Sequence, residues 1–571
     1  MLIPTTLLTL LAAVPEPVQI ATPKKYEAGS ITIDTEDGKR EYHYRLLRPD
    51  VPEGVTLPLV VFMHGAGERG SDNTAQLGHF PGRWLRSPHL NRHDAFVLAV
   101  QCPKNTAWTD WDWKRSSPDQ EPPLTDAMRA VMAAVDDVIA TQPIDENRLY
   151  LTGLSMGGYG SWELGARQPG RWAAVVPICG GGHPEFVDGL VGTPVWAWHG
   201  TKDNVVPERR SRVLVDALRS AGGDVIYTTL PGVGHNSWNT AYGNGGAVDW
   251  MFAQRLNPKQ YELNPVMHAF LNNFNEQEMP DVKDIDPLEF QRNWTPQEPA
   301  EVTIELPEVR EIEIPTTAGT INARLYHPVS MDAEDRTRPL LVWYHGGGWA
   351  LGNLESADSE CRFMADRGDL AVLSIDYRLA PQHRFPAAAD DARDAARWAI
   401  ANAASLNANP HKVAVGGDSS GGNLAAVTAL DLRGDAIPPA LQFLVYPATD
   451  TALDAPSMEH FAQGYMLERD LMGWFLELYA PDRTQWSNWR LAPLHAPSLK
   501  GAPKAVVMLP EMDILRDEGI AYVARLHSEG VPVEYRIEPG MIHGFMDFWP
   551  SSPRANQALH NAITHVRNRL R

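Results

Sequence analysis

The stretch GGDSSGGN, residues 416–423, places a serine between glycines in the pattern G-x-S-x-G. This pattern is typical of a sharp turn from a strand into a helix, in which a strained backbone leaves no room for side chains on either side of the serine. A second stretch, GLSMGGYG at residues 153–160, fits the same pattern. The chain therefore carries two such turns, at Ser155 and Ser419.

The features around the two serines recur in the same order in both halves of the chain. A strand that runs into a histidine and glycines comes first, PLVVFMHGAGERG from Pro58 and PLLVWYHGGGWA from Pro339. After each serine, a strand runs into an aspartate. Then VIYTTLPGVGH (225–235) matches VEYRIEPGMIH (533–543) at five of eleven positions. A repeat of about 300 residues predicts two complete domains, because solenoid units are far shorter.

Apolar runs of strand length alternate with helical patterns throughout both halves, which predicts an α/β fold with a mostly parallel sheet flanked by helices. We predict domains over residues 26–258 and 262–571, with the boundary near residue 260. Asn264-Pro265 and Asp286-Pro287 each combine a helix cap with a proline at the first helical position. We therefore expect two short cap helices within residues 264–294.

The composition is that of a folded protein with no affinity for nucleic acid. Hydrophobic residues make up 43% of the 571 residues and charged residues 21%, as in ordinary globular proteins. The 71 acidic and 50 basic side chains give a formal charge of -21, which repels phosphate backbones and anionic lipid surfaces.

The N-terminal segment, MLIPTTLLTLLAAVPEP, has an apolar stretch of signal-peptide length but no basic residue before it. We predict a signal peptide over residues 1–20 and a secreted or periplasmic protein, with a cytoplasmic location as the alternative. No apolar run reaches the roughly 20 residues that span a bilayer, so we expect no membrane span.

Three cysteines, Cys102, Cys179 and Cys361, are too few and too scattered for a disulfide scaffold or a metal site. We predict that all three cysteines are free thiols. The chain has neither an H-E-x-x-H nor a G-x-x-x-x-G-K-[ST] pattern. We expect no metal and no cofactor.

In each half the order is serine, aspartate, histidine, and each of these residues follows the carboxyl end of a predicted strand, where α/β sheets place their ligands. A serine hydroxyl becomes a nucleophile when an imidazole accepts its proton and a carboxylate orients that imidazole. We assign Ser155, Asp203 and His235 to the first site and Ser419, Asp513 and His543 to the second.

A negatively charged tetrahedral intermediate also needs backbone N–H donors, which the glycine-rich segments and the residue after each serine supply. We expect these donors at Ala66 and Met156 in the first site and at Gly346, Gly347 and Ser420 in the second. Ser420 is not itself the nucleophile, because Asp418 stands where the turn needs glycine.

Residues 262–571 resemble the bacterial hormone-sensitive-lipase family of α/β-hydrolase esterases. The matching stretches are HGGGW (345–349), DYRLAPQHRFPAA (376–388), GDSSGGN (417–423), EMDILRDEG (511–519) and HGF (543–545). This resemblance implies a cap built partly from N-terminal helices and hydrolysis of short to medium acyl esters. Gln382 departs from the family, which usually has glutamate there.

Residues 26–258 resemble a broader α/β-hydrolase group of predicted peptidases and feruloyl-esterase-like or polyhydroxyalkanoate-depolymerase-like proteins. The matching stretches are HGAGERG (64–70), QCP (101–103), LTGLSMGGYG (151–160), PICGGG (177–182) and HGTKDNVVP (199–207). Together the two resemblances imply tandem α/β-hydrolase domains. The usual strand order of that fold implies that the strands ending at Cys102 and Cys179 have two others between them, which puts the two cysteines about 14 Å apart, too far for a disulfide.

Spacing distinguishes the two predicted sites. Only 48 residues separate Ser155 from Asp203, too few for a lid, whereas 94 separate Ser419 from Asp513 and include an aromatic-rich insert at 450–489. We expect an open first site and a more enclosed second one. Near the first site, WTDWDWKR (108–115) offers a sugar-binding platform of Trp108, Trp111 and Trp113, although tryptophans that pack the loop onto its own domain would look the same.

The leading hypothesis is a two-site serine carboxylesterase that removes acetyl or hydroxycinnamoyl groups from plant-derived carbohydrate. One alternative is that the first domain is a peptidase or polyester depolymerase beside a general short-chain carboxylesterase. Another is that one domain is a non-catalytic binding module. The sequence does not determine the oligomeric state or the natural substrates.

Overall fold

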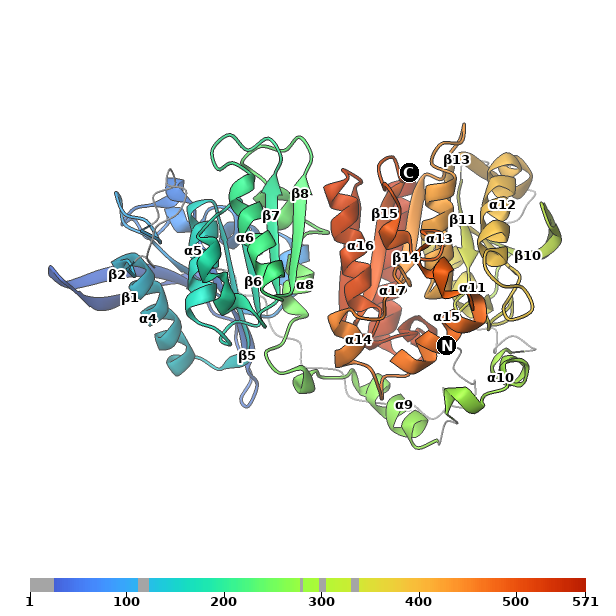
Figure 1. The fold of residues 1–571 in the computed structure, drawn as a ribbon, viewed down its shortest axis with the longest axis horizontal. Helices are drawn as coiled ribbons and strands as arrows, with labels where there is room; N and C mark the ends of the chain where they lie inside the picture. The colour runs from blue at the N-terminus through green and yellow to red at the C-terminus, as the bar shows by residue number, and fades with distance from the viewer. Residues whose placement is uncertain (1–24, 111–122, 278–280, 297–303, 330–337) are drawn as a thin grey trace. The chain divides into compact units, whose positions relative to one another are not determined.

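The computed structural model describes residues 25–110, 123–277, 281–296, 304–329 and 338–571, and Figure 1 shows the ribbon. Two compact units meet in sequence between Gln260 and Tyr261. Each unit contains one eight-stranded sheet flanked by helices. The predicted α/β fold with two tandem domains is confirmed. No helix in the described ranges is both long and apolar enough to cross a bilayer.

The sheet of the first unit has the order β1-β2-β4-β3-β5-β6-β7-β8. β1 pairs antiparallel with β2 and β2 with β4, whereas β3 to β8 pair in parallel. The strands are β1 (Tyr26–Thr35), β2 (Gly38–Leu47), β3 (Leu57–Met63), β4 (Phe96–Val100), β5 (Ile144–Leu154), β6 (Ala174–Ile178), β7 (Val195–Gly200) and β8 (Val225–Leu230). The helices are α2 (Phe80–Trp84), α3 (Pro88–Asn91), α4 (Asp126–Thr141), α5 (Met156–Arg167), α6 (Arg209–Ser220), α7 (Trp238–Ala241) and α8 (Val248–Phe252).

The burial of each strand follows from its place in the sheet. Central β3 has the continuous apolar sequence LPLVVFM and is buried along its whole length, as expected of a strand covered on both faces. The outer strand β1 has a polar sequence, and most of its residues are exposed or half-buried. Because β3 to β8 run parallel, the polar residues that follow these strands lie together at the carboxyl edge of the sheet.

The second unit repeats this topology, with the order β16-β15-β14-β13-β11-β12-β10-β9. The strands are β9 (Glu308–Thr316), β10 (Gly319–His327), β11 (Arg338–Tyr344), β12 (Ala371–Ile375), β13 (Ala408–Asp418), β14 (Leu441–Val445), β15 (Lys504–Met512) and β16 (Val533–Ile542). The helices that follow β11 along the chain are α11 (Asp358–Gly368), α12 (Ala387–Ala401), α13 (Ser420–Asp431), α14 (Pro456–His460), α15 (Arg469–Tyr479), α16 (Arg516–Ser528) and α17 (Pro553–Leu570).

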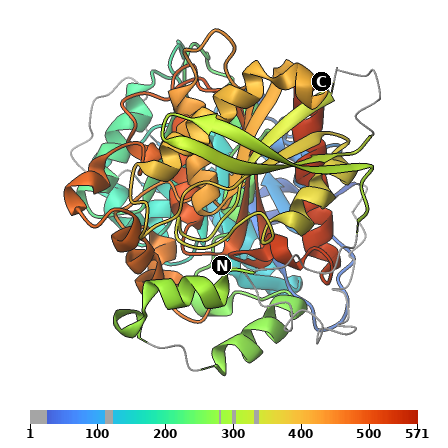
Figure 2. The same cartoon turned by 90° about the vertical axis from the view of Figure 1, so that its right-hand side faces the viewer.

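Two helices precede this second sheet, α9 (Pro265–Asn275) and α10 (Pro287–Trp294), and Figure 2 shows them along the lower edge of the unit. Each begins as the sequence predicts, because the side chains of Asn264 and Asp286 accept hydrogen bonds from backbone N–H groups of the first helical turn. Phe290 of α10 packs edge-on against Trp474 of α15, with ring centroids 5.4 Å apart. These helices therefore lie against the 450–489 insert.

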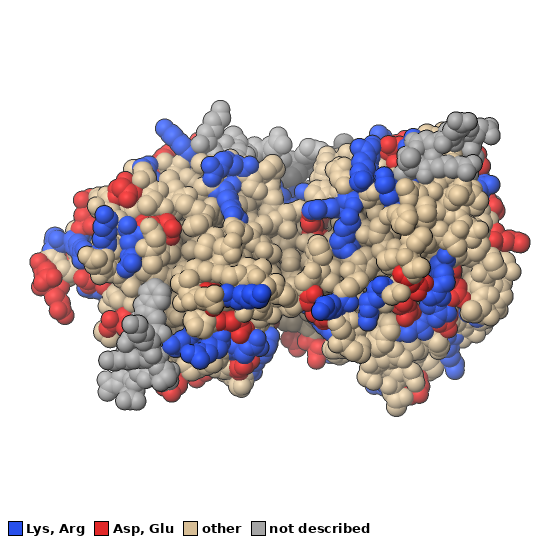
Figure 3. All heavy atoms as spheres, turned by 90° about the horizontal axis from the view of Figure 1, so that it is seen from above, with Lys and Arg blue, Asp and Glu red and all other residues tan. Residues whose placement is uncertain are grey.

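Charged side chains of both signs are interspersed over the face drawn in Figure 3. No single basic patch dominates that face. Because acidic side chains lie among the basic ones, a phosphate backbone finds no continuous basic track on that face.

All three cysteines are buried free thiols. Cys102 follows β4 and Cys179 follows β6, and the strand order places β3 and β5 between them, as predicted. We expect thiol titration of the unreduced protein to find three thiols after denaturation and to proceed very slowly before it, because burial shields the sulfur atoms. Titration of one thiol in the denatured protein would mean that two cysteines form a disulfide.

Candidate active sites

Ser155, Asp203 and His235 come together at the carboxyl edge of the first sheet, after β5, β7 and β8. His235 Nε2 lies 2.9 Å from Ser155 Oγ, and His235 Nδ1 lies 2.7 Å from Asp203 Oδ2. Because the carboxylate oxygen can only accept, Nδ1 carries the proton and Nε2 is left to accept the serine proton. The sequence-predicted residues thus have the geometry of a nucleophile, a base and an orienting carboxylate.

The Ser155 turn has the strain that the motif predicts. Ser155 has φ 54° and ψ -118°, a conformation that side-chain-bearing residues rarely adopt. A Cβ on Gly157 would lie 1.8 Å from the carbonyl oxygen of Met63, so only glycine allows α5 to approach β3 this closely. The strain places the hydroxyl at the sheet edge rather than along the helix.

Ser419, Asp513 and His543 form the same arrangement after β13, β15 and β16. His543 Nε2 lies 3.0 Å from Ser419 Oγ, and His543 Nδ1 lies 2.8 Å from Asp513 Oδ2. Ser419 has φ 55° and ψ -120°, almost the same as Ser155. Gly421 approaches β11 as closely as Gly157 approaches β3.

The carboxylate of Asp203 is held ionised. Burial acts to raise its pKa, but hydrogen bonds from His199, His235 and the backbone N–H groups of Val206 and Val205 lower the pKa to about 2. His199 is fully buried, with Nε2 3.3 Å from Asp203 Oδ2. The aligned position of the second site is Leu509, so this second imidazole contact belongs to the first site alone. Sequence reasoning missed it, although the histidine lies in the quoted stretch HGTKDNVVP.

The two sites differ in exposure. The side chain of His235 is 20% exposed, whereas that of His543 is 1% exposed. The difference agrees with the spacing, which leaves no room for a lid between Ser155 and Asp203.

The expected oxyanion donors of the first site lie on either side of Ser155. Met156 is the first residue of α5, so its N–H has no acceptor within the helix. Ala66 begins a 3₁₀ helix, Ala66–Glu68, directly after β3. His64 holds this segment: its Nε2 accepts from Cys102 N at 2.9 Å and its Nδ1 donates to Gly65 O at 2.7 Å. Burial lowers the pKa of His64 to about 4, so the ring is neutral.

In the second site, Ser420 N–H begins α13 and Gly347 has φ 113° in the loop after β11. Gly346 precedes Gly347 in this loop, and its backbone N–H acts to lower the pKa of the Asp418 carboxyl, against the larger opposing effect of burial. Gly346, Gly347 and Ser420 remain the predicted donors of this site.

The cap is bonded to the segment that follows this loop. Gln291 of α10 donates to Ala350 O at 2.7 Å, and Gln382 donates to Gln291 Oε1 at 2.7 Å. Asn353 also donates to Pro296 O at 2.7 Å. Gln382, the departure from the family pattern, therefore supports the contact between the cap and the glycine loop through a neutral amide.

The predicted sugar platform is wrong at Trp108. The indole is fully buried, its Nε1 donates to His64 O at 2.9 Å, and the ring packs edge-on against His64. A side chain enclosed in the core cannot stack on a sugar, so the packing alternative holds for Trp108. Trp111 and Trp113 lie outside the described residues.

Each triad histidine has a further neighbour that sequence reasoning missed. In the first site it is Cys179, directly after β6, and in the second site it is Tyr446, directly after β14. Both residues have a positive φ, 40° for Cys179 and 35° for Tyr446. The Tyr446 ring lies 4.6 Å from that of His543. Ligand atoms of Cys179, Asp203 and His235 lie within 4.8 Å of one another, close enough to hold a metal ion. However, Asp203 and His235 are bonded within the triad, and burial raises the pKa of the thiol.

A cluster of carboxyl groups lies behind the second site. Glu360, Asp418 and Asp547 line a cavity of about 20 Å³ together with His345. Desolvation is the main cause that raises the pKa of each carboxyl, that of Asp547 to about 7, and repulsion from Asp418 adds to the rise at Glu360 and Asp547. Asp547 is therefore mostly protonated at mildly acidic pH.

We expect Asp547→Asn to stabilise the second domain at pH 8 but not at pH 4. Folding holds a proton on this cluster up to about pH 7, whereas the unfolded chain releases it near pH 4, so folded-state stability falls as pH rises between these values. The amide carries no charge at either pH, so we expect it to raise the free energy of unfolding at pH 8 by about 1–3 kcal/mol. Thermal unfolding of the variant and the parent protein at pH 4 and pH 8 measures this difference. An equal effect at both pH values would contradict the explanation.

Comparison with known proteins agrees with this geometry. Residues 341–547 match a family model described as alpha/beta hydrolase fold, and residues 51–243 match one described as Phospholipase/Carboxylesterase. The carboxylic ester hydrolase LipN of Mycobacterium tuberculosis is 40% identical over 270 residues, 46% of this chain and 71% of that protein. The ethyl acetate hydrolase of Pseudomonas putida is 34% identical over 265 residues, 46% of this chain and 83% of that protein.

Among solved structures, an α/β-hydrolase enzyme from the metagenome of Lake Arreo, Spain, has a TM-score of 0.50 and 36% identity. The match covers 54% of this chain and 98% of that one. The chain belongs to the α/β-hydrolase superfamily. It is a carboxylic ester hydrolase with two hydrolase domains in tandem, as the resemblances predicted.

Proposed function

We propose that both domains are active, so that the chain is a two-site serine carboxylesterase. The observation that carries the proposal is the pair of hydrogen-bonded serine, histidine and aspartate sets, each on its own sheet. Each set has its own strained serine turn and its own backbone N–H donors. A non-catalytic module would need none of these features together.

In the acylation step, the serine Oγ attacks the ester carbonyl carbon while the histidine Nε2 takes the hydroxyl proton. The carbonyl oxygen becomes an oxyanion, and the backbone N–H groups of Met156 with Ala66, or of Ser420 with Gly346 and Gly347, donate to it. The aspartate stabilises the imidazolium. When the tetrahedral intermediate collapses, the carbon–oxygen bond to the alcohol breaks and Nε2–H gives its proton to the leaving alkoxide oxygen.

Deacylation repeats these steps with water. Nε2 takes a proton from the water, whose oxygen attacks the acyl carbon, and a second oxyanion forms at the same donors. Collapse breaks the bond to Oγ, which recovers its proton from the histidine. The products are a carboxylic acid and the free enzyme, and each site needs only its own residues.

The substrates follow from exposure. The enclosed second site, walled by its cap and the 450–489 insert, suits short to medium acyl esters, and a relative named for ethyl acetate supports this. The open first site suits bulky or polymer-linked esters. We propose acetyl or hydroxycinnamoyl esters of plant-derived carbohydrate as its substrates, and export of the protein to reach them.

A substrate panel with the full-length protein tests this proposal. We expect release of acetate from acetylated xylan or of ferulate from methyl ferulate, together with hydrolysis of p-nitrophenyl acetate and butyrate. Inactivity towards both plant-derived esters would overturn the carbohydrate assignment. Cleavage of peptide amides or polyhydroxyalkanoate by the first site would instead favour the peptidase or depolymerase alternative.

A further inference from the structure

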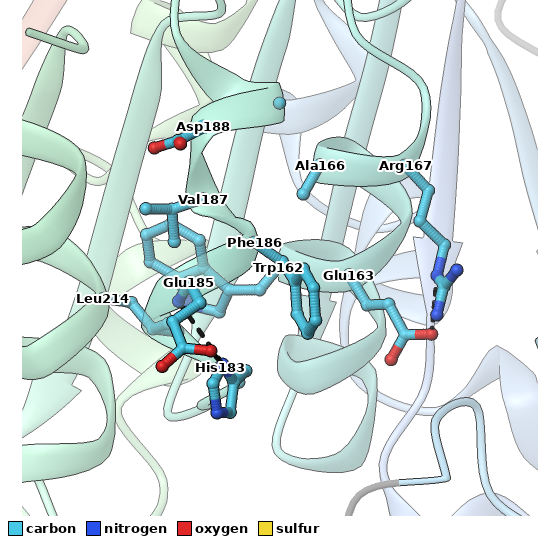
Figure 4. Close-up of a pocket in the computed structure, with 12 residues that line it drawn as sticks. Trp162, Glu163, Ala166, Arg167, His183, Glu185, Phe186, Val187, Asp188 and Leu214 are labelled. Atoms are coloured by element: carbon cyan, nitrogen blue, oxygen red, sulfur yellow. Dashed lines mark hydrogen bonds and ion pairs between the residues drawn. The ribbon is translucent and has the colours of Figure 1, made fainter. Parts of the chain in front are cut away.

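A cavity of about 250 Å³ lies in the first unit, between α5, the segment 182–189 and α6 (Figure 4). Ser155 precedes α5, and Trp162, which lines the cavity, is seven residues further on, about 10 Å along the helix axis. No triad residue lines the cavity. It is therefore separate from the ester-cleaving site.

One wall of the cavity presents a hydrogen-bond donor without an acceptor. Trp162 is 3% exposed, and its Nε1 has no hydrogen-bond partner within the described part of the chain. A buried N–H that leaves water without gaining an acceptor costs about 1–3 kcal/mol. Other buried indole N–H groups of the described residues also lack an acceptor, among them those of Trp172 and Trp349. That of Trp162 belongs to a residue that lines this cavity, where an oxygen atom of a bound molecule would satisfy it.

The rest of the lining is apolar and aromatic. Trp162 and Phe186 contribute aromatic rings, and Ala166, Val187 and Leu214 contribute aliphatic surface. These walls suit a compact organic body. The carboxylates and the histidine of the lining do not form a group of three ligand atoms close enough to hold a metal ion; within the described residues only Cys179, Asp203 and His235 do.

The charges that line the cavity are predominantly negative. Glu163 is paired with Arg167, whose Nε donates to Glu163 Oε1 at 2.9 Å, so this pair is neutral as a whole. Glu185 and Asp188 add two exposed carboxylates, the side chain of Glu185 being 70% exposed. Glu185 Oε2 lies 3.7 Å from Nδ1 of His183, which also lines the cavity (Figure 4). A positive charge beside these carboxylates and the aromatic faces is favoured by Coulomb and cation–π attraction, whereas an anion is repelled.

We propose that this cavity binds a small organic cation that also carries a hydroxyl or carbonyl oxygen. The cationic group lies against the aromatic rings and the carboxylates of Glu185 and Asp188. The oxygen accepts the hydrogen bond from Trp162 Nε1. The site is independent of the ester-cleaving reaction, and binding requires no covalent step.

Three probes separate the parts of this proposal in calorimetric titrations of the full-length protein at low salt. Choline has both the cation and the oxygen, 3,3-dimethylbutan-1-ol has the same shape without the charge, and tetramethylammonium has the charge without the oxygen. We expect choline to bind at least tenfold more tightly than the neutral alcohol and more tightly than tetramethylammonium. No binding of choline, or equal binding of the neutral alcohol, would overturn the proposal.

Variants show whether choline occupies this cavity. Glu185→Gln, at an exposed position that tolerates substitution, should weaken choline about threefold or more, while Asp216→Asn, an equally exposed acid on α6 outside the cavity, should have no effect. Trp162→Phe removes the N–H that would bind the choline oxygen. It should therefore reduce the affinity for choline to that for tetramethylammonium and leave the affinity for tetramethylammonium unchanged. If Glu185→Gln and Trp162→Phe both bind choline as the parent protein does, choline binds elsewhere and the inference is wrong.

Discussion

Replacing Ser419 by alanine is expected to abolish nearly all hydrolysis of short p-nitrophenyl esters, with turnover falling about 10⁴-fold or more. The hydroxyl that His543 Nε2 approaches at 3.0 Å is the only group of that site positioned to attack the carbonyl. The enclosed second site has the walls that hold a short acyl chain, so the open site does not replace it. Steady-state kinetics with p-nitrophenyl acetate and butyrate measure the loss.

The matched control is Ser405→Ala, at an exposed serine of the same domain in the 3₁₀ helix Ala403–Leu406, outside the triad, the cap and the 450–489 insert. It should retain full activity on both esters. If Ser419→Ala kept more than about a tenth of the parent turnover, the short-ester activity would belong to the first site, and our assignment of substrates to the two sites would be reversed.

Ser155→Ala is expected to lower the turnover of bulky or polymer-linked esters about 10⁴-fold or more. The same variant should hydrolyse short p-nitrophenyl esters within about twofold of the parent rate. The reason is that His235 and Asp203 act on Ser155 alone, and each triad lies on its own sheet. Release of ferulate or acetate from polymer substrates measures the loss, and p-nitrophenyl butyrate serves as the internal control. Loss of both activities in this variant would mean that the sites are coupled or that the second triad is inert.

The fold and the triads were largely predictable because both rest on local rules. Residues at the carboxyl ends of parallel strands share one edge of the sheet, so the order of Ser155, Asp203 and His235 along the chain already implies their meeting. The shared strand order of the two sheets was implied by the resemblance to α/β hydrolases, and the repeat indicated that both halves have the same order. The helix caps at Asn264 and Asp286 are equally local, since each side chain bonds to the next turn of backbone.

The incorrect prediction and the missed contacts depended on packing between distant segments. Trp108 looks the same in the sequence whether it faces solvent or His64, and only the tertiary fold decides that it is buried. Likewise, Tyr446 reaches His543 through a positive φ after β14, and no pattern in the sequence signals that contact.

The central claim, that one chain holds two independent serine nucleophiles, is tested most directly by the stoichiometry of covalent labelling. An alkyl fluorophosphonate forms a stable adduct with a serine that its histidine activates, and intact-mass spectrometry counts the adducts on each chain. We expect two adducts on the parent protein, at Ser155 and Ser419, one on each alanine variant and none on the double variant. A single adduct on the parent protein at saturating reagent would contradict the claim.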